Sequence, residues 1–277
     1  MKRIVTIQDI SCVGKCSLTV ALPIISAMGV EAAIVPTAVL STHTMFSGFT
    51  VKDLTSEIKP ISDHWKKEGF KFDGIYTGYL GSFEQIDLMK EFFDDFKTED
   101  NIILVDPAMA DNGKLYPAFD ESYAKYMATL CEKADMIVPN VTEACFMLGK
   151  EYKEKYDEAY IKELLAGLSA LGAKISVLTG VGFEEGKTGV MGYDRINDEY
   201  FYFEQPKLPC SYHGTGDIFS STCMGAMTLG LDWKKALIVA AKYTAECIRV
   251  TFETPGSNTY GVDFERVVPY LLELLQA

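Results

Sequence analysis

The chain is poor in basic residues and in histidine. It has 26 lysines and arginines against 39 acidic residues, a formal net charge of −13, and only three histidines in 277 residues. Binding of nucleic acid or of an anionic membrane surface requires clusters of lysine and arginine that displace counterions, and no such cluster is present. The composition argues against both partners. An anionic ligand would have to be bound locally, by backbone dipoles and a metal ion.

The cysteines and histidines lack the spacing of metal ligands. The seven cysteines are odd in number, contain no Cys-x-x-Cys pair, and are scattered at positions 12, 16, 131, 145, 210, 223 and 247. We expect free thiols and no zinc site. The sequence also has no Gly-x-Ser-x-Gly elbow, so it does not support hydrolase chemistry.

Long hydrophobic runs are absent as well. No stretch approaches the roughly 20 apolar residues of a membrane span, and Met1–Ile7 leads directly into a strand pattern. We therefore expect a cytoplasmic protein. No linker, repeat or low-complexity tract divides the chain, which predicts one domain over residues 1–277.

Short apolar runs alternate with longer amphipathic segments. The runs have the length of buried strands, and they are Ile4–Ile7, Ala32–Val35, Gly74–Thr77, Ile102–Val105, Met136–Val138 and Ile175–Leu178. The segments with helical spacing are Ser17–Met28, Phe83–Phe96, Glu143–Leu148 and Asp157–Leu171. This alternation predicts an α/β fold with a doubly wound, mostly parallel sheet flanked by helices.

The hydrophobic pattern changes to period two late in the chain. Val190–Tyr193 and Glu199–Phe203 are predicted to form an antiparallel hairpin at one edge of the sheet. Two apolar helical segments, Leu231–Val250 and Val262–Leu275, follow.

Polar residues and glycines follow nearly every predicted strand. In open α/β sheets, ligands bind outside the carboxyl ends of the strands, and the segments at those ends are Gln8–Ser11, Thr37, Gly78–Gly81, Asp106–Pro107, Pro139–Glu143 and Thr179–Gly180. Repeated Asp, Asn, Glu and Thr at the same edge exceeds what ordinary loops require. This edge is the predicted site.

The most informative motif is His213–Ser221, which places Gly214 and Gly216 around Thr215 and follows them with Asp217. Glycines allow successive backbone N–H groups to point toward one anion, and the helix predicted to begin here adds its positive end. Asp217 stands where a base could accept a proton from an attacking hydroxyl. Gly-x-Gly before a helix is common, so the motif needs its context.

Two other glycine patterns have simpler explanations. Gly182–Thr188 resembles a Walker A loop but has three residues between its glycines instead of four, and a strand pattern follows it. A hairpin turn explains it better. Neither Gly180–Gly182 nor Gly214–Gly216 is followed by the third glycine of the dinucleotide fingerprint, which argues against NAD.

Taken in order along the chain, these motifs resemble the ribokinase-like superfamily of small-molecule kinases. Three segments resemble the pyridoxal kinase branch: Ser41–Thr44 resembles its Ser-Asn-His-Thr loop, Thr77–Ser82 its Gly-Tyr segment, and Asp106–Asp111 its Asp-Pro-Val-Met-Gly-Asp motif. The resemblance implies ATP-dependent phosphorylation of the 5′-hydroxymethyl group of pyridoxal, pyridoxamine or pyridoxine, in the salvage of vitamin B6.

The resemblance also implies roles at the glycine motif. Asp217 would deprotonate the substrate hydroxymethyl group, and the backbone of Gly214, Thr215 and Gly216 would stabilise the charge on the transferring phosphoryl group.

Other residues would hold the nucleotide and its metal ion. Asp106 and Glu143 would organise Mg²⁺ directly or through water, and Asn140, Thr179 and Gly180 would contact the nucleotide. A turn aspartate and a first-turn helix glutamate are the structural alternatives for the two acids. A monovalent cation such as K⁺ is a further possible requirement, and similar kinases are commonly homodimers.

The vitamer would be bound by four side chains. Tyr79 would stack on the pyridine ring, His43 and Thr44 would hydrogen-bond ring substituents, and Ser11 would contribute from the first strand. A core tyrosine is the alternative for Tyr79.

One segment departs from the pyridoxal kinase pattern. Pyridoxal kinases usually have Gln-Ser at the end of the first strand, whereas Gln8 here precedes Asp9 and the serine follows at position 11. Asp9–Gly14 resembles instead the Asp-x-Ser loop of hydroxymethylpyrimidine kinases. That activity is therefore an alternative, and a non-catalytic ligand-binding member of the same fold is another.

Overall fold

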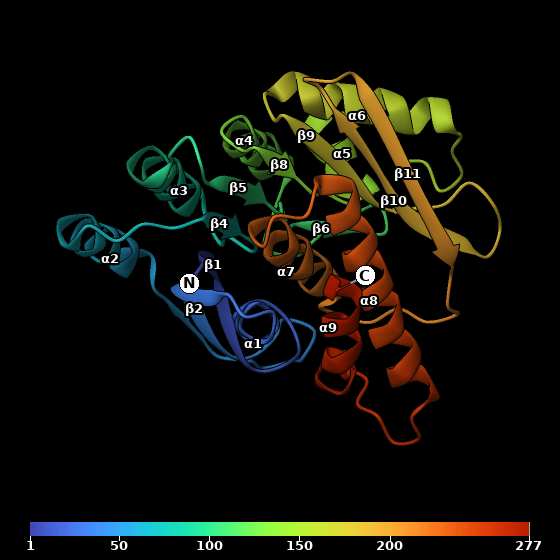
Figure 1. Cartoon of the computed structure of the whole chain (residues 1–277), viewed down its shortest axis with the longest axis horizontal. Coiled ribbons are helices and arrows are strands. Elements are labelled where there is room, and N and C mark those ends of the chain that lie inside the picture. The colour runs from blue at the N-terminus through green and yellow to red at the C-terminus, as the bar shows by residue number, and fades with distance from the viewer. Residues whose placement is uncertain (277) are drawn as a thin grey trace. The chain divides into compact units, whose positions relative to one another are not determined.

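The computed structural model describes residues 1–276, and its elements are labelled in Figure 1. The chain divides into two compact units, the first formed by residues 1–78 and 208–276 and the second by residues 79–207. Each unit contains its own part of the mostly parallel sheet. The prediction of one domain over residues 1–277 stays a prediction.

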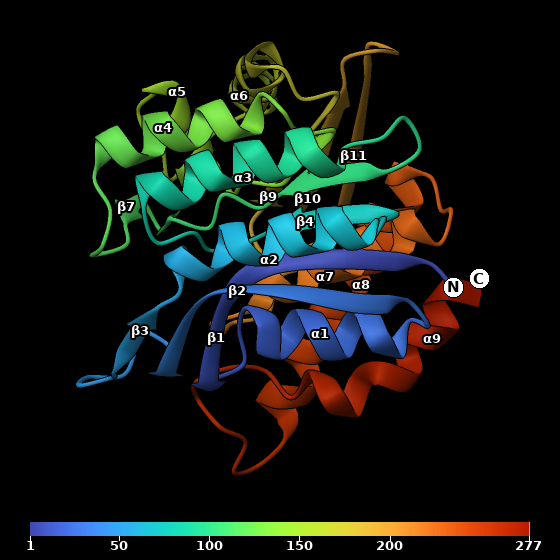
Figure 2. The same ribbon diagram turned by 90° about the vertical axis from the view of Figure 1, so that its left-hand side faces the viewer.

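In the first unit, β1 (Arg3–Val13) is the central strand. It pairs in parallel with β2 (Glu31–Thr42) and β4 (Gly74–Thr77), while the short β3 (Val51–Asp53) runs antiparallel to β2. The helices of this unit are α1 (Leu18–Ala27), α2 (Thr55–Glu68), α7 (Thr215–Thr228), α8 (Trp233–Glu253), the 3₁₀ turn η1 (Phe264–Val267) and α9 (Val268–Gln276). Figure 2 shows α1 and α2 on opposite sides of β1 and β2.

The second unit continues the same design. Its parallel strands β5 (Ile102–Val105), β8 (Met136–Ile137) and β9 (Ile175–Val181) are followed by an antiparallel hairpin, and β10 (Lys187–Asp194) pairs with both β9 and the edge strand β11 (Glu199–Pro206). A two-stranded ribbon joins β6 (Ala110–Asp111) to β7 (Lys114–Leu115). The helices are α3 (Phe83–Phe96), α4 (Glu121–Cys131), α5 (Val141–Leu148) and α6 (Glu158–Leu171).

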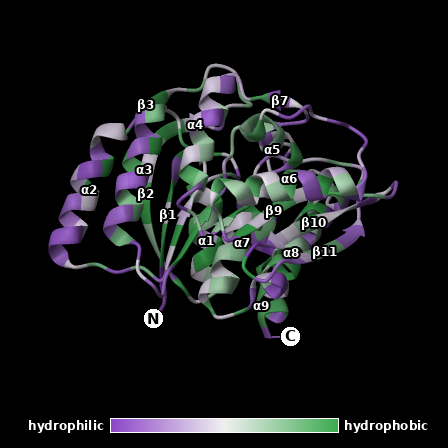
Figure 3. Cartoon of the chain, turned by 90° about the horizontal axis from the view of Figure 1, so that it is seen from above, coloured by the Kyte–Doolittle hydropathy of each residue, from purple (hydrophilic) through white to green (hydrophobic). Residues whose placement is uncertain are grey.

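The strands form because continuous apolar runs are buried on both faces. Ile4, Val5 and Ile7 of β1 and Val177 of β9 are fully buried, as parallel strands covered by helices require. Figure 3 shows the central strands largely in hydrophobic colours, whereas α2 is mostly hydrophilic. Among residues 1–276, no helix combines the length and apolar character needed to cross a membrane.

Most predicted segments coincide with observed elements. The predicted bounds of β4, β5 and α3 agree with the structure, and the hairpin prediction is confirmed by β10 and β11. The first strand was predicted to end at Ile7, but β1 continues through Asp9 and Ser11 to Val13. Its register against β2 shifts between Gln8 and Ile10. Helices α2 and α4 were not among the predicted segments.

Candidate active site

The glycine motif of the first unit adopts the predicted geometry at the start of α7. Gly214 is the N-cap residue, with φ 81° and ψ 1°, and no side chain caps this helix end. A Cβ on Gly214 would lie 1.8 Å from the carbonyl oxygen of Lys15, whereas one on Gly216 would meet nothing within 4 Å. Glycine is therefore required at position 214 for close packing. The exposed position 216 leaves the backbone open to an anion.

Asp217 lies in the first turn of α7 and is half-buried. It is close enough to Cys16 to act on it electrostatically: burial, together with the charges of Asp217 and Asp9, raises the pKa of the Cys16 thiol. Cys16 therefore stays protonated at neutral pH.

His43 is held by the protein on both ring nitrogens. Its side chain is buried, Nδ1 accepts a hydrogen bond from the backbone N–H of Met45, and Nε2 lies 2.8 Å from the carbonyl oxygen of Tyr260. Because Nδ1 accepts, Nε2 carries the proton and donates it to Tyr260. The predicted contact of His43 with the substrate stays a prediction, and both nitrogens already have backbone partners. Thr44, next in the chain, is exposed.

His213, which directly precedes the glycine cradle, packs against His43 with ring centroids 4.4 Å apart. Burial and the nearby His43 lower its pKa to about 4. The two rings thus join the turn after β2 to the start of α7.

Ser11 is almost completely buried and donates its hydroxyl proton to Asp9, at 3.0 Å. Asp9 also accepts a hydrogen bond from Ser17, at 2.6 Å. The pKa of Asp9 is raised by burial, and the two hydroxyl donors and His43 offset only part of that rise. The predicted substrate contact of Ser11 is untested, and its hydroxyl is engaged inside the protein. The roles of Asp9 and Ser17 were not predicted.

In the second unit, Asn140 and Glu143 form a capping box at the start of α5. The Asn140 side chain accepts a hydrogen bond from the Glu143 N–H at 2.9 Å, and Glu143 accepts one from the Asn140 N–H at 2.8 Å. The Asn140 amide also donates to the carbonyl oxygen of Ala110. The side chain predicted to contact nucleotide phosphates therefore also fixes the end of β8 to β6.

Glu143 is a buried carboxylate that faces a second acid. Its Oε1 accepts hydrogen bonds from the backbone N–H groups of Met109 and Ala110, at 3.0 and 3.4 Å. Burial and the charge of Asp106 raise the pKa of Glu143, and Asp106 is itself buried. Two buried acids that repel one another suit a cation, because a positive charge would offset both.

These two acids are compatible with Mg²⁺. Magnesium prefers hard oxygen ligands and commonly uses one or two carboxylates together with water and phosphate oxygens. No group of three or more His, Cys, Asp and Glu side chains that could hold a metal occurs in residues 1–276, so this part of the chain offers no closed metal cage. The predicted pair fits a cation that phosphates help to hold.

Thr179 and Gly180 lie beside Asn140 at the carboxyl end of β9. Thr179 forms an isolated parallel bridge with Asn140, and its N–H donates to the carbonyl oxygen of Pro139 at 3.0 Å. Gly180 is exposed with φ 73°, a conformation that favours glycine. The structure thus brings the three predicted nucleotide residues of this unit together.

Tyr79 is half-buried, so its exposure is intermediate between that of a core tyrosine and that of an open ligand-binding surface. Its ring contacts Phe119 at 5.5 Å between centroids, and Phe119 stacks on Tyr123 at 4.0 Å. The hydroxyl of Tyr123 donates to the carbonyl oxygen of Leu80. This aromatic series fixes the segment after β4 and leaves part of the Tyr79 ring accessible.

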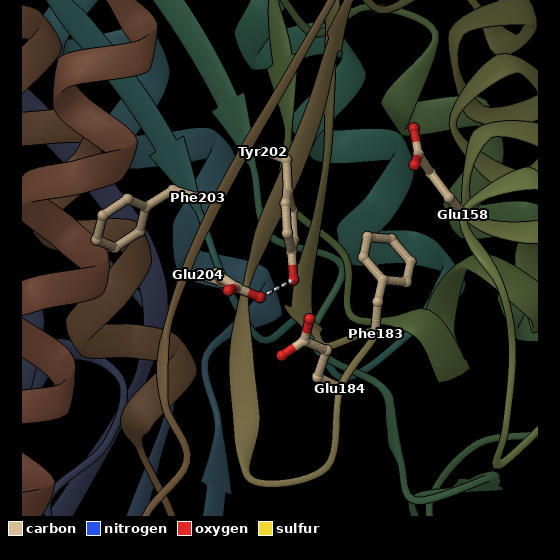
Figure 4. Close-up of a pocket in the computed structure, with 6 residues that line it drawn as sticks. All are labelled: Glu158, Phe183, Glu184, Tyr202, Phe203 and Glu204. Atoms are coloured by element: carbon tan, nitrogen blue, oxygen red, sulfur yellow. Dashed lines mark hydrogen bonds between the residues drawn. The ribbon is translucent and has the colours of Figure 1, made fainter.

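A pocket of about 440 Å³ opens beside the hairpin of the second unit, as Figure 4 shows, and it is lined by Glu158, Phe183, Glu184, Tyr202, Phe203 and Glu204. The rings of Phe183 and Tyr202 lie 4.9 Å apart, and the Tyr202 hydroxyl donates to Glu204 at 3.2 Å. Three carboxylates repel a triphosphate. We therefore expect the nucleotide phosphates at Thr179 and Gly180 and not in this pocket.

The matching protein-family model is that of phosphomethylpyrimidine kinase, and it covers residues 21–262. The chain belongs to this family. One curated relative of this family member is the pyridoxal kinase of Dictyostelium discoideum. The two sequences are 25% identical over 239 residues, which are 80% of this chain and 77% of that protein.

Solved structures extend the likeness to the whole fold. A Bacteroides thetaiotaomicron protein assigned to the phosphomethylpyrimidine kinases, in a crystal form with pyridoxal, is 41% identical with a TM-score of 0.93, covering 98% of this chain and 95% of that one. Pyridoxal kinase from Lactobacillus plantarum is 29% identical with a TM-score of 0.91, covering 99% and 98%. The predicted fold class and the resemblance to pyridoxal kinases are confirmed, and this family member is a kinase.

Proposed function

We propose that this kinase transfers the γ-phosphoryl group of ATP to the 5′-hydroxymethyl group of pyridoxal, pyridoxamine or pyridoxine. The observation that carries the proposal is the 41% identity, over nearly the whole chain, to a structure that holds pyridoxal. The glycine cradle with Asp217 at the start of α7 supplies the groups that such a transfer needs.

In the proposed reaction, Asp217 accepts the proton of the substrate hydroxymethyl group. The hydroxyl oxygen then bonds to the γ-phosphorus while the bond to the β-phosphate oxygen breaks, and ADP leaves. The backbone N–H groups around Gly214 and Gly216 stabilise the negative charge on the transferring group. His213 and His43, packed against each other, hold the cradle next to the turn after β2.

The second unit would hold the remaining phosphates. Asn140, Thr179 and Gly180 contact the nucleotide in this proposal, and Asp106 and Glu143 hold Mg²⁺, which when bound neutralises phosphate charge. Tyr79 would stack on the pyridine ring, and Thr44 would hydrogen-bond a ring substituent. A requirement for K⁺, a homodimer and a cytoplasmic location belong to the same proposal.

The test is an ATP- and Mg²⁺-dependent phosphorylation assay with pyridoxal, pyridoxamine, pyridoxine, hydroxymethylpyrimidine and ribose, read by ADP release and product mass. We expect the three pyridine alcohols to give the highest kcat/KM. Preferential turnover of ribose, or binding without turnover of any alcohol, would contradict the proposal.

Hydroxymethylpyrimidine kinase is the second candidate, supported by the name of the matching family. The same base and cradle would serve a pyrimidine hydroxymethyl group, so the chemistry alone does not separate the two. The ratio of kcat/KM for pyridoxine and hydroxymethylpyrimidine, measured in one preparation, decides between them.

A further inference from the structure

Asp9 is an ionisable residue inside the protein that the proposed reaction does not use. Its side chain is 4% exposed and accepts hydrogen bonds from the hydroxyls of Ser11 and Ser17. It also lies where β1 shifts register, so that Asp9 stands opposite both Thr37 and Ala38 of β2. Such irregularities in a sheet redirect a side chain, and here the side chain meets Ser17 at the start of α1.

Ser17 holds a backbone conformation that serine rarely adopts. Its φ is 52° and its ψ is −135°, close to a region populated almost entirely by glycine. Serine at a helix N-cap usually bonds the backbone of the first turn, but Ser17 makes no such bond. Its hydroxyl bonds Asp9 instead, at 2.6 Å. The strained conformation therefore has a specific partner that maintains it.

The loop that ends at Ser17 supports the glycine cradle. A Cβ on Gly214 would lie 1.8 Å from the Lys15 carbonyl oxygen, and one on Gly261 would lie 2.4 Å from the Lys15 Cβ. On the other side, a Cβ on Gly14 would lie 2.6 Å from the His43 ring. Loop 14–17 is thus enclosed by the cradle, the segment at Gly261 and His43. A change in its path would displace Gly214.

We propose that Asp9 is a positioning residue for phosphoryl transfer: by bonding Ser17 it holds loop 14–17 in the strained path that places the Gly214 cradle beside Asp217. The changes in kcat expected from this positioning role rest on the proposed kinase function. It assigns Asp9 no contact with substrate. Its effect reaches the reaction through Ser17, Lys15 and Gly214.

The test compares four variants at saturating ATP and vitamer. Asp9→Ala and Ser17→Ala each remove the bond but retain a strained side chain at position 17, so kcat should fall by about 30- to 100-fold, the scale expected for small displacements of reacting groups. Ser17→Gly adopts the same backbone angles without strain and should stay within about fivefold of wild type. In the double variant Asp9→Ala/Ser17→Gly, glycine should restore most of the lost kcat.

Two control variants test whether the effect is specific to the bond between Asp9 and Ser17. Ser11→Ala removes the second donor to Asp9 without touching loop 14–17, so the amides of residues 212–218 should exchange at the wild-type rate in this variant. Asp73→Ala removes an acid paired with Lys2 before β4, away from the loop, and should change nothing. If Asp9→Ala does not fold, the contrast between Ser17→Ala and Ser17→Gly still tests the proposal.

Hydrogen exchange provides a readout that needs no substrate. Amides of residues 212–218 should exchange faster in Asp9→Ala and in Ser17→Ala, and return to wild-type rates in the double variant. If wild type phosphorylates no vitamer while the exchange pattern holds, the function is wrong and the positioning role stands. Equal activity of Ser17→Ala and Ser17→Gly, or unchanged exchange in Asp9→Ala, would overturn the inference.

Discussion

Two buried acids near the ends of strands, Asp9 in the first unit and Glu143 in the second, are satisfied in different ways. Asp9 in the first unit accepts hydrogen bonds from two serine hydroxyls. Glu143 in the second unit accepts them from backbone N–H groups of Met109, Ala110 and Asn140, and it also faces the acid Asp106. Asp9, with its two hydroxyl donors, holds together the chain segments that carry those serines. Glu143, beside a second acid, is suited to bind a cation.

Neither Asp9 nor Glu143 is the catalytic base if Asp217 accepts the substrate proton. Asp217→Asn removes the proposed proton acceptor and should lower kcat by about 10³-fold or more with little change in ATP affinity, because only the transition state loses an interaction. Steady-state kinetics and nucleotide titration measure the two effects. A variant with nearly wild-type kcat would move the base to another residue, and one of the two buried acids would then be a candidate.

Glu143→Gln tests the cation side of the comparison. The neutral amide cannot offset a cation and places an N–H group toward backbone donors, so kcat should fall by about 10²-fold and the apparent Mg²⁺ requirement should rise. Asp9→Asn is the matched control in the first unit, and its Mg²⁺ dependence should equal that of wild type. Rates measured across a Mg²⁺ series decide. A shift for Asp9→Asn as large as that for Glu143→Gln would show that the two acids do not differ in this way.

His213 gives the smallest expected effect and concerns stability. Its pKa in the folded protein is about 4, below the ordinary value near 6.5, because the ring is largely withdrawn from water and packs beside His43. As the pH falls below 6.5, the unfolded chain binds a proton at His213 before the folded protein does. The free energy of unfolding is therefore highest above pH 6.5 and decreases as the pH falls toward 4. Between pH 7 and 4.5 the wild type should lose roughly 2–3 kcal/mol more than His213→Phe, which keeps the ring without the titration.

Urea unfolding at the two pH values, with wild type and His213→Phe side by side, measures that difference. The Phe variant serves as the control, since the ionisable groups that do not contact position 213 titrate equally in both proteins. Equal losses would mean that His213 accepts a proton in the folded state as easily as in the unfolded chain.

The two units also differ in how well their parts could be predicted from sequence. Asp106, Asn140 and Thr179 lie at or near the carboxyl ends of parallel strands, and Glu143 lies in the first turn of the helix after β8. Parallel strands bring their ends to one edge, so the proximity of these residues was predictable. The capping box between Asn140 and Glu143 is also readable from a three-residue spacing.

The first unit was less predictable because its decisive contacts are long-range or conformational. The partner of His43 Nε2 is a carbonyl oxygen 217 residues away in the chain. Ser11 was predicted to contact the substrate, and its hydroxyl donates a hydrogen bond to Asp9. Nothing in a serine at position 17 indicates a positive φ. Burial of a hydroxyl and strain of a backbone are properties of the folded chain, and composition or periodicity does not contain them.

The strained loop has a consequence for how related sequences can vary. If Ser17 keeps its conformation only through Asp9, then position 17 can change to glycine by itself, whereas Asp9 can be lost only after that change. Descendants that exchange Asp9 for an apolar residue should carry glycine at position 17, and those that gain glycine first can lose the acid without penalty. The order of the two exchanges along a lineage would thus be fixed by one backbone angle.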